Sequence, residues 1–364
     1  MLRAAIFFLY PSDMKISVLR ERRAGETRVA ATPETVKKLV ASGHSVTIES
    51  GAGTVAGFPD DSFSEAGATL APDAAAATKG ADIVFKVRAP EDGEFSALPD
   101  GVALIALMDP SNLDATPLNG KKIAALSMEF TPRITRAQSM DALSSQSNLS
   151  GYRSVIEGAQ IYGRAMPMMM TAAGTIAPAK VFIMGVGVAG LQAIATARRL
   201  GAVVTATDVR PAAKEQVASL GAKFIAVEDE EFKAAETAGG YAKQMSPEYQ
   251  AKQAELTASH ITKQDIVITT ALIPGRAAPV LVTEEMVKTM KPGSVIVDMA
   301  VSQGGNCPLS KPDEIVDVNG VKVAGFSNLP ARLPADASSL FAKNLLAFLP
   351  LVTAEDGSLN LDTD

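Results

Sequence analysis

One segment in the middle of the chain constrains its fold more than any other, because an apolar run ends at three glycines before a helical stretch and a second apolar run. The first run is 180–184, the glycines are Gly185, Gly187 and Gly190, and the second run is 202–207. This order is typical of the start of a parallel α/β sheet that binds a dinucleotide. Gly185 permits a tight turn, Gly187 lets the backbone approach a pyrophosphate, and Gly190 lets the helix pack on the strand.

An acidic residue closes the second run. Asp208 follows it, roughly 20 residues beyond the first glycine, where a carboxylate accepts hydrogen bonds from the ribose hydroxyls of an adenosine. Its charge would also repel a 2′-phosphate. The N-terminus of the helix after the glycines offers free N–H groups and a positive dipole end to the phosphates. The sequence therefore predicts NAD(H) rather than NADP(H) as the cofactor.

Length and patterning predict two domains. The chain has 364 residues, 47% of them apolar, and short apolar runs alternate with helical stretches along both halves. We expect an α/β protein with two doubly wound, Rossmann-like domains, each with a parallel sheet. One would comprise residues 1–142 plus 333–364, and the other, residues 143–332, would bind NAD(H). Residues 335–349 are amphipathic, and we expect this C-terminal helix to cross back to the first domain.

Composition excludes several other classes. The net charge is −6 and the chain lacks a long basic run, which argues against a nucleic-acid surface. One cysteine, Cys307, and two histidines, His44 and His260, exclude an intrachain disulfide and argue against a bound metal. No apolar run reaches the roughly 18–20 residues needed to span a bilayer. We expect residues 1–13 to be an extension without a role in the fold.

A polar segment between the two predicted domains is a candidate site. Residues 132–148 are dense in hydrogen-bonding side chains, and Arg133, Gln138 and Asp141 could orient a carboxamide and ribose hydroxyls. We expect a loop facing a ligand, although composition alone equally allows a solvated linker. A second candidate is 239–241, in which two glycines give hinge freedom and Tyr241 can cover a ligand. An exposed flexible loop is the alternative there.

Six segments together carry a specific resemblance, which runs from about Met14 to about Leu349. They are 21–30 (ERRAGETRVA), 136–141 (RAQSMD), 143–148 (LSSQSN), 168–174 (MMMTAAG), 185–192 (GVGVAGLQ) and 271–275 (ALIPG). They closely resemble the NAD(H)-binding component, domain I, of proton-translocating transhydrogenase. The resemblance implies direct hydride transfer between NAD(H) on this chain and NADP(H) on a partner domain, in the Re/Si-specific class of these enzymes. A separate membrane subunit would couple transfer to proton translocation. It also implies a homodimer, held peripherally on the cytoplasmic side of the inner membrane through the complex.

The same resemblance implies roles for individual residues. Arg133, Gln138 and Asp141 would act at the nicotinamide end, near the partner's cofactor. Gly240 and Tyr241 would belong to a mobile loop that closes over the nucleotide. The full set of implied NAD(H)-binding residues is Arg133, Gln138, Ser139, Met140, Asp141, Ser144, Gly185, Gly187, Val188, Gly190, Asp208, Val209, Arg210, Gly240, Tyr241 and Leu272.

Alanine dehydrogenases look similar and provide the main alternative, an NAD-dependent amino-acid dehydrogenase. Arg28 and Lys86 fall where those enzymes bind the substrate's carboxylate and carbonyl. Those enzymes use a histidine as acid and base after the strand predicted at 102–107, and this chain has Met108 and Asp109 there. Oxidative deamination needs a group that titrates near neutrality. The sequence therefore favours the transhydrogenase, with Arg28 and Lys86 as interdomain ion-pair or packing residues.

Overall fold

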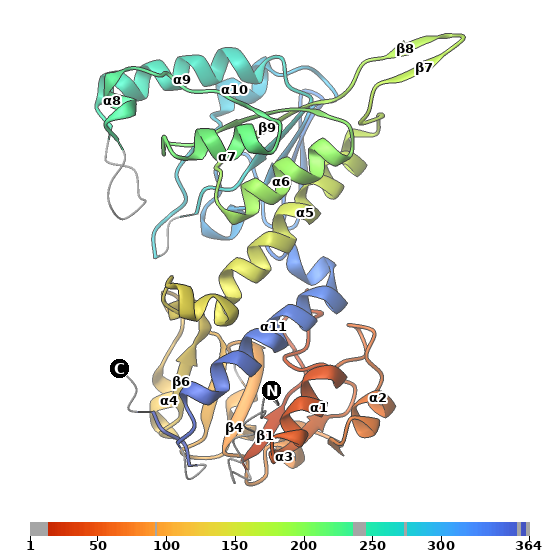
Figure 1. The fold of residues 1–364 in the computed structure, drawn as a ribbon, viewed down its shortest axis with the longest axis vertical. Helices are drawn as coiled ribbons and strands as arrows, with labels where there is room; N and C mark the ends of the chain where they lie inside the picture. The colour runs from red at the N-terminus through yellow and green to blue at the C-terminus, as the bar shows by residue number, and fades with distance from the viewer. Residues whose placement is uncertain (1–13, 92, 236–244, 273–274, 355–357, 362–364) are drawn as a thin grey trace, which may run out of the picture. The chain divides into compact units, whose positions relative to one another are not determined.

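The computed structural model describes residues 14–91, 93–235, 245–272, 275–354 and 358–361. Contacts divide the chain into two compact units (Figure 1). Unit 1 joins the residues up to Gln146 to those from Pro330 onward, and unit 2 is Ser147–Leu329. The sequence places these divisions a few residues away, at 142/143 and 332/333.

Unit 1 is built on a six-stranded parallel sheet with the order β3-β2-β1-β4-β5-β6. Its strands are β1 (Lys15–Val18), β2 (Ser45–Glu49), β3 (Thr69–Ala71), β4 (Ile83–Arg88), β5 (Ala103–Leu107) and β6 (Ala124–Ser127). The order reverses between β1 and β4, so these two strands form the switch point of a doubly wound sheet.

Short helices connect these strands: α1 (Pro33–Ala41), α2 (Asp60–Glu65), α3 (Ala74–Ala77) and α4 (Thr116–Gly120). α1 begins at residues that favour a helix start, because Thr32 is its N-cap and Pro33 its first residue. The hydroxyl of Thr32 accepts the backbone N–H of Thr35, and the hydroxyl of Thr35 accepts the N–H of Thr32.

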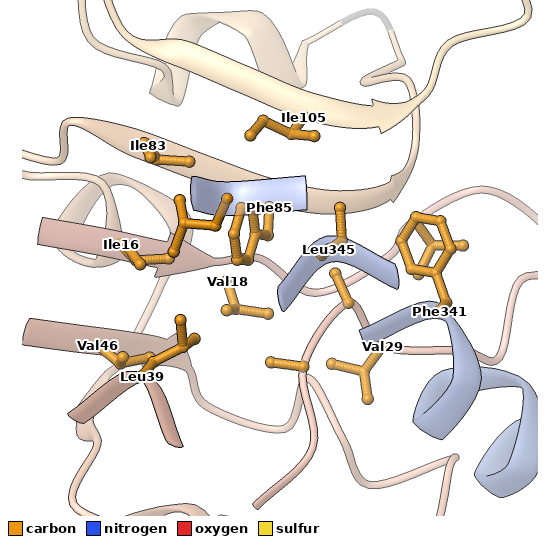
Figure 2. Close-up of a cluster of buried hydrophobic side chains, with 14 of the residues drawn as sticks. Ile16, Val18, Val29, Leu39, Val46, Ile83, Phe85, Ile105, Phe341 and Leu345 are labelled. Atoms are coloured by element: carbon orange, nitrogen blue, oxygen red, sulfur yellow. The ribbon is translucent and has the colours of Figure 1, made fainter. Parts of the chain in front are cut away.

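The C-terminal helix completes the core of unit 1. α11 (Pro334–Phe348) inserts Phe341 and Leu345, both essentially fully buried, among residues of β1, β2, β4 and β5 (Figure 2). Phe85 of β4 lies in the same cluster. Burying side chains of this size stabilises the fold by about 1.5–3 kcal/mol each. The expected return of the C-terminal helix to the first domain is therefore confirmed.

Unit 2 carries a seven-stranded sheet with the order β11-β10-β9-β12-β13-β15-β14. Its strands are β9 (Lys180–Met184), β10 (Val203–Thr207), β11 (Lys223–Phe224), β12 (Ile266–Thr269), β13 (Val295–Asp298), β14 (Ile315–Val318) and β15 (Val321–Gly325). Six strands run parallel, and β14 pairs antiparallel with β15 at the edge. The switch point lies between β9 and β12.

The helices of unit 2 are α6 (Val188–Arg199), α7 (Ala213–Ser219), α8 (Glu230–Lys233), α9 (Pro247–Ile261) and α10 (Glu284–Thr289). α5 (Ala142–Tyr162) begins in unit 1 and continues into unit 2. A two-stranded hairpin, β7 (Met169–Thr171) and β8 (Gly174–Ile176), extends from unit 2 (Figure 1). The two doubly wound domains are confirmed, whereas α9, the hairpin and the antiparallel strand β14 were not predicted.

Candidate dinucleotide-binding site

The glycine turn of unit 2 has the geometry that close packing requires. Gly185 directly follows β9 with φ at +101°, and a Cβ there would lie 2.5 Å from Oγ1 of Thr270. A Cβ on Gly190 would lie 1.9 Å from the carbonyl oxygen of Gly185. Both positions therefore demand glycine, the first for conformation and space and the second for space alone. Gly187 differs, because nothing lies within 4 Å of a Cβ placed on it.

The N-terminus of the helix after this turn is exposed at Gly187 and Val188. Gly187 is the N-cap of α6 and brings no side-chain cap to the first turn. Its N–H groups and dipole therefore suit an anion. A glycine not singled out from the sequence, Gly151 of α5, supports this terminus, because a Cβ there would lie 2.1 Å from the carbonyl oxygen of Ala189. These features fit a dinucleotide's pyrophosphate at the switch point.

Three apolar side chains lie exposed at the carboxyl ends of neighbouring strands. Val188 follows β9 and is 41% exposed, Val209 follows β10 and is 63% exposed, and Leu272 follows β12 and is 48% exposed. Apolar residues that remain uncovered around a switch point suit the flat faces of a nucleotide. All three belong to the set implied by the sequence.

Asp208 lies beside the glycine turn but is not a free carboxylate. Its Oδ2 accepts the backbone N–H of Val186 at 2.7 Å, and its Oδ1 accepts the backbone N–H of Arg210 at 2.9 Å. The guanidinium of Arg210 adds bonds of 2.8 Å from Nε to Oδ1 and 3.0 Å from Nη2 to Oδ2. The hydrogen bond to Asp208 raises the pKa of Arg210. A cation therefore lies beside the charge that the sequence analysis expects to repel a 2′-phosphate, and the preference for NAD(H) stays a prediction.

The loop after β12 is held by a residue that sequence analysis missed. The buried amide of Asn306 accepts the N–H of Ala271 at 3.1 Å and donates to the carbonyl oxygens of Ala271 and Pro279, at 2.9 and 2.8 Å. The next residue, Cys307, donates its N–H to Asp298. Asn306 thus fixes both ends of the loop that carries Leu272.

The polar segment expected as a loop belongs to unit 1 and is partly helical. The 3₁₀ helix η3 (Thr135–Met140) carries Gln138 and Ser139, which are exposed, whereas Met140 is buried. α5 begins at Ala142, so Ser144 lies on a helix rather than in a loop. Helix formation follows locally from Asp141, whose carboxylate accepts the N–H of Ser144 at 2.8 Å, as an N-cap does.

A second residue that sequence analysis missed, Asn344 of α11, holds η3 and the start of α5 by hydrogen bonds. Its amide nitrogen donates to the carbonyl oxygen of Ser139 at 2.8 Å, and its amide oxygen accepts the hydroxyl of Ser145 at 2.7 Å. Asn344 is 6% exposed. The exposed side chain of Gln138 therefore projects from a turn whose backbone is held at the neighbouring Ser139.

The implied site residues thus form two groups. Arg133, Gln138, Ser139, Met140, Asp141 and Ser144 lie in unit 1; Gly185, Gly187, Val188, Gly190, Asp208, Val209, Arg210 and Leu272 lie in unit 2. Gly240 and Tyr241 lie outside the described residues. In the described stretches of the chain, no three His, Cys, Asp or Glu side chains gather as metal ligands would.

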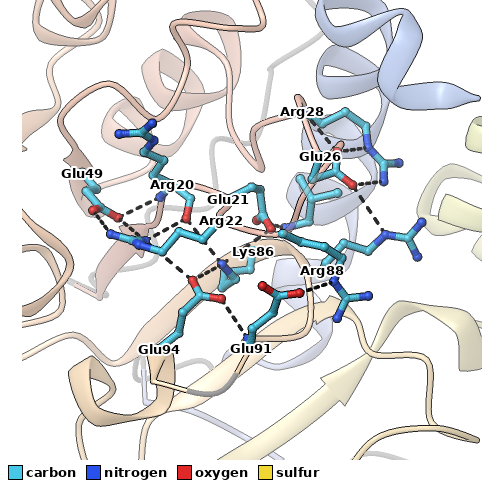
Figure 3. A network of polar contacts seen from close by, with 12 residues as sticks. Arg20, Glu21, Arg22, Glu26, Arg28, Glu49, Lys86, Arg88, Glu91 and Glu94 are labelled. Carbon is cyan, nitrogen blue, oxygen red and sulfur yellow. Dashed lines mark hydrogen bonds and ion pairs between the residues drawn. The ribbon is translucent and has the colours of Figure 1, made fainter. Parts of the chain in front are cut away.

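A network of charged side chains lies at the switch point of unit 1, around the end of β4 (Figure 3). Lys86 of β4 is 1% exposed and pairs with Glu94 at 2.7 Å and Glu21 at 3.5 Å. The backbone N–H of Val87 donates to Glu21 at 2.6 Å. Burial raises the pKa of Glu21 to about 7, against the opposing charge of Lys86.

Arg28, like Lys86, is almost fully buried and is paired with a carboxylate. Its guanidinium donates to both oxygens of Glu26 at 2.7 Å and to the amide oxygen of Gln146 at 2.7 Å. Burial alone would raise the pKa of Glu26, but its bonds to Arg28 and the nearby charges outweigh it and lower the pKa to about 2. Arg28 and Lys86 are ion-paired as expected, but inside unit 1 rather than between the domains.

The segment after β5, where the resemblance to alanine dehydrogenases implies a histidine, carries Met108 and Asp109 instead. Asp109 has φ at +50° and accepts two bonds from the side-chain amide of Asn112. His260, on α9, contacts Thr205 at 2.9 Å and Gln264 at 3.1 Å, and burial lowers its pKa. Both residues therefore have local structural partners.

Among the described residues, no helix is long and apolar enough to cross a membrane. Comparisons with known proteins place these features in context. The N-terminal domain of the alanine dehydrogenase/PNT family matches residues 17–150, and its C-terminal domain matches residues 154–364. An NAD(P) transhydrogenase alpha-subunit chain of Rhodospirillum rubrum is 60% identical over 345 residues, covering 92% of this chain and 89% of that protein.

Solved structures agree. The transhydrogenase of Sinorhizobium meliloti superposes with a TM-score of 0.86 at 53% identity, covering 93% of each chain. An L-alanine dehydrogenase superposes with a TM-score of 0.78 at 27% identity, covering 92% of this chain and 89% of that one. The two matching domains and the higher similarity to transhydrogenases show that the chain belongs to the alanine dehydrogenase/PNT family and, within it, groups with the NAD(P) transhydrogenase alpha subunits.

Proposed function

We propose that this chain is the NAD(H)-binding component of a proton-translocating transhydrogenase, and that it exchanges hydride directly with NADP(H) held by a partner domain. One observation carries the proposal. The two sheets share the order of their first five strands, yet the switch point of unit 2 carries a glycine turn while that of unit 1 carries the buried Lys86 and its carboxylate partners. Among the described residues, the glycine turn of unit 2 therefore supports one dinucleotide site, with the second nucleotide held by a partner.

The resemblance assigns nucleotide binding to the implied residues of unit 2 and the nicotinamide end to those of unit 1. The N-terminus of α6 would hold the pyrophosphate, Asp208 would bind the adenosine ribose, and Val188 and Leu272 would contact the flat faces of the nucleotide's rings. NAD(H), when bound, supplies the nicotinamide that gives or accepts hydride. Arg133 and Asp141 would orient that end, and Gln138 would act near the partner's cofactor. Because hydride transfer needs reacting atoms about 3–3.5 Å apart, positioning supplies much of the catalysis.

Assembly follows from the same proposal. The chain works as a homodimer, for which the hairpin of β7 and β8 is a candidate contact, because Met168, Met169 and Met170 on it are 60, 47 and 75% exposed. The complex includes a membrane subunit that couples transfer to proton movement. This component sits on the cytoplasmic face of that membrane. The relatives' description as subunit alpha supports partners of this kind.

Gln138→Asn tests the proposed mechanism. We expect hydride transfer in the reconstituted complex to slow by about ten-fold or more, while NADH affinity changes by less than about three-fold. The reason is that the proposed contact between Gln138 and the partner's cofactor is made mainly in the transition state. Stopped-flow transfer at saturating nucleotides measures it, with Gln216→Asn on α7 as the control. An unchanged rate would remove Gln138 from the mechanism.

A further inference from the structure

All the favourable acceptor positions of Asp208 are in use. Each carboxylate oxygen has two lone-pair directions, so the group accepts about four hydrogen bonds. Two of these bonds come from backbone N–H groups, of Val186 and Arg210, one on each oxygen. The other two come from the guanidinium of Arg210, again one on each oxygen.

The two guanidinium bonds are the ones a ribose would need. Removing the side chain of Arg210 would leave each oxygen of Asp208 with its backbone donor and with one free position. Two free positions match the two hydroxyls of an adenosine ribose. The backbone donors cannot leave without unfolding the turn, whereas the arginine can rotate away, since its side chain is 35% exposed and that of Asp208 is 7% exposed.

We propose that the side chain of Arg210 competes with the adenosine ribose for Asp208 and, once displaced, provides the cation that a 2′-phosphate would pair with. The inference rests on the proposed NAD(H) site and concerns how that site sets its affinity. Nη2 of Arg210 also donates to the carbonyl oxygen of Val186 at 3.1 Å, so the guanidinium lies next to the glycine turn before it is displaced. Bidentate pairing with a phosphate is the preferred chemistry of such a group.

Three variants separate these roles. Arg210→Met removes the competitor and keeps the apolar stem, Asp208→Asn removes the carboxylate, and Arg199→Met, on the exposed end of α6, is the control. The probes are NADH, NADPH, 5′-AMP and adenosine 2′,5′-bisphosphate. Isothermal titration calorimetry on the whole chain measures the affinity for each. The mononucleotides report the ribose subsite without the nicotinamide.

For Arg210→Met we expect NADH and 5′-AMP to bind about three- to five-fold more tightly, as release from a partly exposed ion pair allows. Adenosine 2′,5′-bisphosphate should gain nothing or bind more weakly. For Asp208→Asn we expect the reverse, with weaker 5′-AMP binding and stronger bisphosphate binding, because the freed guanidinium meets the 2′-phosphate. Arg199→Met should match the unaltered chain.

Weaker binding of 5′-AMP to Arg210→Met would overturn the inference, because it would make Arg210 a contributor to ribose binding rather than a competitor. Unchanged 5′-AMP binding in that variant would overturn it as well. Failure of the proposed function is distinct: the unaltered chain would then bind neither NADH nor 5′-AMP. Thermal melting of each variant checks that the turn remains folded.

Discussion

Glu21→Gln should change how the stability of this protein depends on pH. Burial raises the pKa of Glu21 from 4.5 to about 7 in the folded chain. Between these values the folded chain holds a proton that the unfolded chain has released, so the free energy of unfolding falls as pH rises. This contribution is complete below about pH 4.5 and is lost as the pH passes 7.

The magnitude follows from the shift. One pKa unit corresponds to about 1.36 kcal/mol, so the loss between pH 5 and pH 8 is about 2.5 kcal/mol. Glutamine keeps the shape of the protonated acid and does not titrate. The glutamine variant should therefore gain about 2.5 kcal/mol relative to the unaltered chain as the pH rises from 5 to 8.

Urea denaturation at several pH values measures this difference. Glu65→Gln, on the exposed face of α2, is the matched control and should follow the unaltered chain throughout. Parallel curves for Glu21→Gln and the unaltered chain, within about 0.5 kcal/mol, would refute the reasoning, because Glu21 would then be ionised in the folded state. Glu26 acts oppositely: its pKa of about 2 gives stability that is lost as pH falls below about 4.5.

Two further predictions concern the site. Gly190→Ala should lower the melting temperature, because its Cβ would collide with the carbonyl oxygen of Gly185. Gly187→Ala should melt like the unaltered chain but bind NADH about ten-fold more weakly, since its methyl group would occupy the space of the pyrophosphate. Calorimetric melting and NADH titration measure the two effects, and equal melting temperatures for the two variants would contradict the prediction for Gly190. Asn344→Leu should slow hydride transfer more than it weakens NADH binding, because it releases the backbone of Ser139. Transfer kinetics and NADH titration measure the two effects, with Lys343→Leu on the same helix as the control. The same behaviour in both variants would contradict this prediction.

Much of the fold follows from local signals. Thr32 and Pro33 predict the start of α1, and the glycines predict the turn from β9 to α6, because these residues act through their immediate neighbours. Two missed elements also carried such signals. Asn319 and Gly320, with φ at +52° and +86°, join β14 to β15 as a tight hairpin, and Ser246 before Pro247 caps α9.

The remaining features depend on contacts between residues that are distant in the chain. Arg210 lies two positions from Asp208, yet their pairing becomes clear when the turn also brings Val186 to the same carboxylate. Asn306 and Asn344 reach loops that lie far from them in sequence. Lys86, Glu21 and Glu94 likewise meet through the sheet. Such polar clusters follow from tertiary packing and leave no periodic pattern in the sequence.

The central claim is that this chain holds one nucleotide and receives its redox partner from another polypeptide. The most direct test mixes the purified chain with NADH and a spectroscopically distinct NADP⁺ analogue, with and without an NADP(H)-binding domain from a transhydrogenase. We expect rapid reduction of the analogue when that domain is present and no reduction above the uncatalysed rate when it is missing. Equal reduction by the chain alone, or none in the mixture although both nucleotides bind, would contradict the account.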